Sequence, residues 1–149
     1  MKQFALAIAM ILGITLSAQS AELNSVMSYN YDNKTMSPGI GIGTRVAGFG
    51  VGYLLLDSQS NGKTTYAHIV AVSKDLYANG PWSMGIKGGA AYLARQSNED
   101  GWASMYGPYV SYRLSPDFRV VTEVLRVKGY GPVAAFEPTI VQVGFRYSF

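Results

Sequence analysis

Among side chains that exchange a proton readily near neutral pH, the sequence offers a single histidine, His68. A histidine acts as a general base when a serine hydroxyl or another nucleophile lies within hydrogen-bonding reach. The residues after His68 are apolar, and the next serine, Ser73, lies five positions further along, so in an extended strand the two would face opposite sides. We therefore expect a structural position for His68, in the interior or at an interface, and no enzymatic activity.

No metal or cofactor site is expected. Zinc sites use three or four histidine, cysteine or carboxylate ligands, and one histidine without any cysteine is a poor basis for such a set. The lack of cysteine also argues against a disulfide-stapled scaffold and against thiol redox chemistry. The formal net charge of +3 is small and scattered along the chain, so we expect no nucleic acid partner.

Six charged residues lie within segments that are otherwise apolar or rich in glycine, and in each segment they fall on the glycine-rich side of an apolar–polar alternation: Arg45, Lys87, Arg113, Arg119, Glu123 and Arg146. Five are basic and one is acidic, and a buried charge without a partner is costly. We expect Glu123 to bridge to Arg113 and Arg146, and Asp57 or Asp75 to contribute near the segment ends. Two interpretations stay open: an ionic network that fills the interior, or a basic path or pocket for an anion.

The elements that carry these residues are short and evenly spaced. Seven turn-like breaks divide the chain after residue 20: Asn33–Pro38, Ala47–Gly48, Ser58–Lys63, Ala78–Pro81, Ser97–Gly101, Ser115–Asp117 and Gly129–Pro132. The eight segments between them have about 8 to 13 residues, near the length that a tilted transmembrane strand needs. The breaks therefore predict eight strands.

Most segments alternate between an apolar side and a polar or small side. In the last one, the apolar side comprises Thr139, Val141, Val143, Phe145, Tyr147 and Phe149. The intervening positions hold Ile140, Gln142, Gly144, Arg146 and Ser148. The six charged residues all fall on the polar, glycine-rich side of their segments. The facing of the segment from 66 to 75 stays open, because either phase would bury an unfavourable side chain.

Composition and the two ends of the chain favour a membrane barrel over a soluble sandwich. Only 14% of residues are charged, against about 25% in a soluble domain. Lys2, the apolar run over 4–16 and the small residues over 17–21 form the layout of a secretory signal. We expect a signal peptide over 1–20 and, over 21–149, a closed antiparallel up-and-down transmembrane β-barrel of about eight strands, monomeric, in the outer membrane.

The final residues carry a resemblance. Gly144 to Phe149 resemble the terminal signature of bacterial outer-membrane proteins, which implies that Phe145, Tyr147 and Phe149 are read by the barrel-assembly machinery, after periplasmic chaperones have escorted the chain. The segment after residue 20 is similar to the small OmpX-like, opacity-like and neisserial surface-protein-like barrels. Its glycine-rich strands and its turn over Leu114 to Phe118 carry that likeness.

The resemblance implies a non-enzymatic outer-membrane barrel with a structural or surface-interaction role. Its partners would be outer-membrane lipids and lipopolysaccharide, whose phosphates Lys34, Lys63 and Lys128 in the expected outer loops can attract. One alternative is a narrow pore, or a binder of small amphiphiles, that uses the basic, glycine-lined lumen. Another is a lipid A-modifying enzyme centred on His68, but the His-x-Ser arrangement of known lipid A deacylases is missing here.

Overall fold

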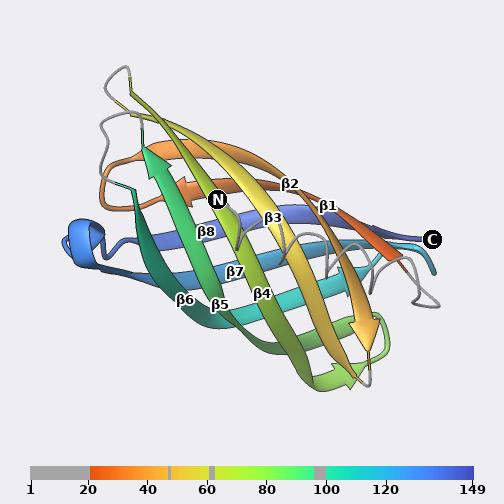
Figure 1. The fold of residues 1–149 in the computed structure, drawn as a ribbon. Helices are drawn as coiled ribbons and strands as arrows, with labels where there is room; N and C mark the ends of the chain where they lie inside the picture. The colour runs from red at the N-terminus through yellow and green to blue at the C-terminus, as the bar shows by residue number, and fades with distance from the viewer. Residues whose placement is uncertain (1–20, 47, 61–62, 96–99) are drawn as a thin grey trace.

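The computed structural model describes residues 21–46, 48–60, 63–95 and 100–149. They form one closed barrel in which each strand pairs antiparallel with the next and β8 pairs with β1 (Figure 1). The strands are β1 (Ala21–Asn30), β2 (Thr35–Val46), β3 (Phe49–Ser60), β4 (Lys63–Asn79), β5 (Trp82–Arg95), β6 (Gly101–Arg113), β7 (Phe118–Tyr130) and β8 (Thr139–Ser148). A 3-10 turn, η1 (Gly131–Val133), lies between β7 and β8. The expected up-and-down barrel of eight strands is confirmed, whereas the expected signal peptide falls outside the described residues.

Two strands are longer than the sequence pattern indicates. β4 has 17 residues and β5 has 14, against the expected 8 to 13 or so. The predicted break over Ser58–Lys63 belongs largely to β3 and β4, since their pairing continues through Ser60↔Lys63. Thr35–Pro38 likewise belongs to β2. Threonine favours strands, and the polar residues 58–60 and Thr64 continue the pairing of β3 and β4, so polar composition alone did not mark the turn.

The two ends of the barrel differ in their connections. Ala21, the first described residue, and Phe149 lie at one end, where Ala21 N donates to Phe149 O at 3.1 Å and Phe149 N donates to Ala21 O at 3.0 Å. At this end, which we call the terminal end, β2 ends and β3 begins, and the same holds for β4 with β5 and for β6 with β7. At the other, which we call the loop end, β1 ends and β2 begins, and the same holds for β3 with β4, β5 with β6 and β7 with β8.

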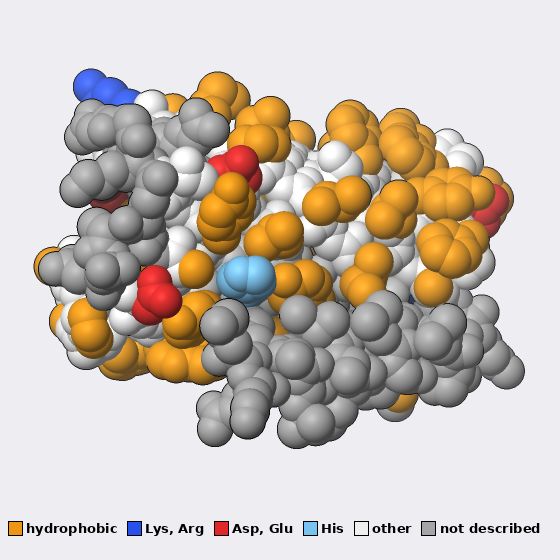
Figure 2. Space-filling view, turned by 45° about the horizontal axis from the view of Figure 1, so that its top comes forward, with side chains coloured by type: hydrophobic (Ala, Val, Ile, Leu, Met, Phe, Trp, Pro, Cys, Tyr) orange, Lys and Arg blue, Asp and Glu red, His pale blue; other side chains and the backbone are white. Residues whose placement is uncertain are grey.

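The apolar side of the strands faces outward. Large apolar side chains such as Ile40, Ile86 and Tyr106 are exposed by more than half of their surface. Figure 2 shows hydrophobic side chains covering much of the barrel wall that is visible from this side. Contiguous exposed apolar surface of this kind is rare on soluble monomers, and it is the arrangement of a barrel with lipid outside.

The burial pattern also settles the phase of β4. Ile69 and Ala71 are buried and Asp75 is half-buried on the inner face, whereas Val72 is exposed on the outer face. A bulge between Asp75 and Tyr77 shifts the register near the terminal end. Within 66–75 the alternation is unbroken, and the segment was ambiguous because both faces carry polar side chains, with Ser73 and Asp75 on the inner face and His68 and Lys74 on the outer face.

The lumen divides into an apolar half and a polar half. Toward the loop end, eleven buried residues form one core: Leu54, Leu56, Ile69, Ala71, Ala91, Leu93, Ala103, Met105, Leu125, Val127 and Val133. Val133 comes from η1 and packs over Gly101, where a Cβ atom would lie 2.6 Å from its side chain. The charged inner residues lie toward the terminal end, whereas the buried polar residues Ser28, Asn30 and Ser37 of β1 and β2 lie toward the loop end.

The part of the chain described here contains no helix with the length and hydropathy needed to cross a membrane.

Candidate functional site

The candidate site is the polar half of the lumen, built by inner-face positions of seven strands. The structure places all six charged residues singled out from the sequence on this face: Arg45 on β2, Lys87 on β5, Arg113 on β6, Arg119 and Glu123 on β7, and Arg146 on β8. Period-two alternation brings each of them inward, because successive side chains of a strand point to opposite faces. Their mutual contacts depend on the stagger of the strands around the barrel.

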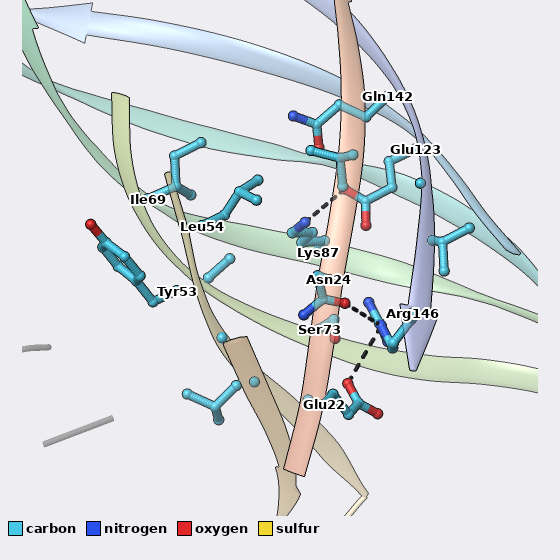
Figure 3. A pocket seen from close by; sticks show the side chains of 18 of the residues that line it. Glu22, Asn24, Tyr53, Leu54, Ile69, Ser73, Lys87, Glu123, Gln142 and Arg146 are labelled. Carbon is cyan, nitrogen blue, oxygen red and sulfur yellow. Dashed lines mark hydrogen bonds and ion pairs between the residues drawn. The ribbon is translucent and has the colours of Figure 1, made fainter. Parts of the chain in front are cut away.

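Glu22 of β1 joins two of the arginines. Arg45 Nε lies 3.3 Å from Glu22 Oε1, and Arg146 Nε lies 3.4 Å from Glu22 Oε2. Arg146 Nε also donates to Asn24 Oδ1 at 3.0 Å (Figure 3). Glu22 was not among the interior charged residues predicted from the sequence, although it lies two positions before Asn24 and therefore shares its face. One buried carboxylate thus holds β2 and β8 against β1.

Asp75 of β4 forms the second junction. Its Oδ2 atom lies 2.6 Å from Arg45 Nη1, and its Oδ1 atom accepts a hydrogen bond from the Tyr109 hydroxyl. The Tyr109 ring reaches Asp75 by crossing β5 at Gly85, where a Cβ atom would lie 2.7 Å from Tyr109 Cζ. The expected contribution of Asp75 is therefore seen, while Asp57 stands at an outward position near the loop end, away from the arginines.

Glu123 pairs with Lys87, a partner that was not predicted from the sequence. Its Oε2 atom lies 2.7 Å from Lys87 Nζ, whereas we had expected bridges to Arg113 and Arg146. Gly107 of β6 stands directly opposite Lys87 and presents no side chain between β5 and β7. The lysine can therefore extend across β6 to a strand that is not its neighbour in the sheet.

A cavity of about 60 Å³ lies between these ion pairs and the apolar core (Figure 3). Its polar wall includes Glu22, Asn24, Lys87, Glu123, Gln142 and Arg146, and glycines of β2 and β3 line it as well. Gln142 is 1% exposed and donates from Nε2 to Ser28 Oγ at 2.7 Å, while its Oε1 atom has no hydrogen-bond partner among the described residues. A cavity of this size with polar groups in its wall has room for water molecules, and Gln142 Oε1 offers them an acceptor.

His68 lies on the outer face of β4, at an interface position, and not in the lumen. Its Nδ1 atom lies 2.7 Å from the Tyr53 hydroxyl, and its ring lies between those of Tyr53 and Tyr92, at centroid distances of 6.2 and 6.5 Å. Figure 2 shows it among apolar side chains. Ser73 lies on the inner face, so the barrel wall separates the two groups. Within the described residues, no group of three or more potential ligands could hold a metal ion.

The C-terminal aromatic residues line the outer wall near the terminal end. Phe145, Tyr147 and Phe149 are all exposed. The Phe145 ring stacks on Phe118 of β7 at 5.5 Å, and Tyr147 stacks on Phe149 at 6.1 Å. They are therefore available to a partner that approaches from outside, and their recognition by the assembly machinery stays a prediction.

Comparisons with known proteins assign the fold. No model of a known protein family and no curated protein matches this sequence. The N-terminal β-barrel domain of Pseudomonas aeruginosa OprF has a TM-score of 0.72 at 11% identity, over 89% of this chain and 98% of that one. Neisserial surface protein A has a TM-score of 0.65 at 13% identity, over 87% and 95%. The outer membrane protein OprG of Pseudomonas aeruginosa has a TM-score of 0.58 at 12% identity, over 89% and 96%. The chain thus has the fold of the small eight-stranded outer-membrane barrels.

Proposed function

We propose that this chain is a non-enzymatic, monomeric β-barrel of the outer membrane of a Gram-negative bacterium, with a structural role in the envelope and a lumen closed to solutes. Similar proteins such as OprG are outer membrane proteins by name. The exposed apolar wall suits a lipid environment, and the closed sheet leaves no unpaired strand edge in it. Both properties belong to the whole barrel wall, so the support they give to an outer-membrane location does not depend on any single residue.

Aromatic side chains near both ends of the wall support a membrane-spanning position. Near the terminal end, the rings of Trp82 and Tyr112 lie 4.6 Å apart. Near the loop end, those of Tyr92 and Trp102 lie 5.4 Å apart, and Tyr130 pairs with Trp102 across β6 and β7. Such rings favour the two membrane–water interfaces. Short turns mark the periplasmic side of bacterial barrels, so the terminal end is assigned to the periplasm.

The apolar core of the loop half is the observation that carries the closed lumen. Leu125 is 0% exposed and Val133 is 1% exposed, so the section between β3 and β7 is filled by side chains. An ion that crossed it would have to leave water for apolar surroundings, at a large cost in free energy. The core therefore argues for a barrel that seals the membrane at this level.

Single-channel recording in planar lipid bilayers tests this proposal. The refolded barrel, verified by its faster migration on a gel before boiling than after, is expected to give no discrete conductance steps. A matched pair of variants locates the barrier: Leu125→Ser changes the core, and Val124→Ser changes the neighbouring outward residue. Leakage in Leu125→Ser alone supports the proposal. Regular steps from the unaltered, folded barrel would contradict it.

The cavity in the polar half is the observation that favours a second candidate, a narrow pore. Under that function the apolar core would open transiently, and Arg146 beside the cavity would select for anions. Conductance steps whose anion preference falls in Arg146→Gln would identify the pore. The same recordings therefore separate the two candidates.

Lipopolysaccharide is the proposed outer partner. Lys34, in the turn between β1 and β2, and Lys128, on the outer face of β7, are both exposed near the loop end. Cations at this level can meet the phosphates of the outer leaflet. The side chain of Lys63, the third lysine of this group, lies outside the described residues.

A further inference from the structure

Three arginines face one another along a single row at the terminal end of the lumen. In the strand register, Arg113 of β6 stands opposite Arg119 of β7, and Arg119 stands opposite Arg146 of β8. Directly opposed residues on one face have Cβ atoms about 4.5–5.5 Å apart, and like charges in such positions repel. A barrel that keeps three of them in register needs negative charge nearby.

The inner-face carboxylates among the described residues cover this need only in part. Glu123 is engaged by Lys87, and Asp75 is engaged by Arg45 and Tyr109. Glu22 is shared between Arg45 and Arg146. Among the described residues, neither Arg113 nor Arg119 has a carboxylate oxygen within 4.0 Å of its guanidinium nitrogens.

The balance of charges leaves the cluster positive. The arginine cluster, which we define as Arg45, Arg113, Arg119 and Arg146, carries four positive charges against the two negative charges of Glu22 and Asp75. The excess is therefore two positive charges. In addition, Arg45 Nη2 is inaccessible to solvent and has no hydrogen-bond partner among the described residues.

We propose that the arginine cluster binds a soluble multivalent oxyanion of the phosphate class at the terminal-end mouth of the lumen. A planar guanidinium donates two parallel hydrogen bonds to a phosphate, and several guanidiniums around one phosphate neutralise its charge. The excess of two positive charges matches a phosphate dianion. Arg113 is exposed at the mouth, so a ligand from the surrounding solution can reach the row.

The position of the cluster selects a soluble anion over a lipid headgroup. The inner-face positions point away from the outer wall, where the side chains of Trp82 and Phe145 are exposed. Beyond the polar half, the apolar core closes the lumen, so the ligand enters and leaves at the same mouth. The periplasmic location of this mouth rests on the proposed function, whereas the binding itself is a property of the barrel.

Isothermal titration of the refolded barrel with inorganic pyrophosphate, in zwitterionic micelles at constant ionic strength, tests the site. We expect saturable binding at one site and a loss of about ten-fold or more in affinity in Arg119→Gln. Arg126→Gln is the matched control, because Arg126 lies on the same strand but faces outward. No saturable binding, or equal losses in both variants, would overturn the proposal.

A stability readout separates binding from a merely structural role. Without pyrophosphate, Arg119→Gln relieves repulsion within the row, so its urea midpoint should be equal to or higher than that of the parent. Pyrophosphate should then stabilise the parent more than the variant. The opposite result would be a lower urea midpoint for Arg119→Gln than for the parent in anion-poor buffer, together with equal stabilisation of both proteins by pyrophosphate. It would show that Arg119 stabilises the fold and does not bind the anion.

Vesicles distinguish the two sources of phosphate. In phosphatidylcholine vesicles, pyrophosphate should bind as it does in micelles, and the addition of phosphatidylglycerol should leave its affinity unchanged. If phosphatidylglycerol displaced pyrophosphate through Arg119, a lipid headgroup would be the ligand and the soluble-anion proposal would fail. Conductance recordings test whether the lumen is closed, and their result does not depend on whether the arginine cluster binds pyrophosphate.

Discussion

Lys87 Nζ lies 2.7 Å from Glu123 Oε2, and this ion pair joins β5 to β7, two strands that are not neighbours in the sheet. The Lys87 side chain is 13% exposed and the Glu123 side chain is 6% exposed. Both residues line the cavity, so the pair is a tie across the lumen as well as part of the cavity wall.

Removal of one partner of this pair should be costly. Glu123→Gln leaves the Lys87 ammonium buried without its counter-charge, and we expect the free energy of unfolding to fall by about 3–5 kcal/mol. Urea unfolding in lipid vesicles, followed by tryptophan fluorescence, measures the change. The double variant Lys87→Met, Glu123→Leu removes both charges and should recover most of the loss. A double variant as unstable as Glu123→Gln would contradict the pairing.

Gly107 should tolerate no side chain. A Cβ atom at this position would lie 1.9 Å from the backbone oxygen of Val124 on β7, so Gly107→Ala should prevent β6 and β7 from pairing as they do. Loss of the fast-migrating folded form on unboiled gels measures this effect. Gly88→Ala is the control, because its Cβ atom would lie 3.8 Å from the nearest atom, Met105 O, and it should fold normally. Normal folding of both variants would show that the close approach at Gly107 is not required.

Phe149 should matter for assembly in cells more than for the stability of the folded barrel. Its side chain is 73% exposed on the outer wall, so Phe149→Ala removes few internal contacts and removes a residue that the terminal signature implies is recognised. We expect less folded protein in the outer membrane and unchanged refolding in detergent. Tyr106→Ala, which alters another exposed outward aromatic residue, should assemble normally. Equal amounts of folded protein in the two variants would contradict the assembly role.

His68 should be dispensable for lipid A chemistry. Its Nδ1 atom is engaged by the Tyr53 hydroxyl, and Ser73 lies beyond the barrel wall, so this pair cannot form a nucleophile and its base. Mass spectra of lipid A from membranes with and without the protein should be the same. A shift equal to an acyl chain or a head-group substituent, abolished in His68→Ala but not in Tyr53→Phe, would make the protein an enzyme.

Local sequence patterns determined the number of strands and the facing of most of them. β8 illustrates why: Val143 and Phe145 alternate with Gly144 and Arg146, and an extended chain must place such neighbours on opposite faces whatever surrounds it. Alternation could also have placed Glu22 on the inner face, because it lies two positions before Asn24 on the same strand. β4 was the exception, because both of its faces carry polar side chains, with Asp75 on the inner face and His68 and Lys74 on the outer face.

Only the tertiary structure decided which face is inside and which charges meet. Alternation is the same for a soluble sandwich and a membrane barrel, and the burial of Gly43, Gly85 and Gly144 shows that the glycine-rich face lies inside the closed barrel. The pairing of Glu123 with Lys87, and not with Arg113 or Arg146, follows from the stagger of β5, β6 and β7 and from the gap at Gly107. Stagger is a property of all eight strands together. The hydrogen-bond register of each strand with the one before sets its position along the barrel axis, and the last strand must also pair with the first.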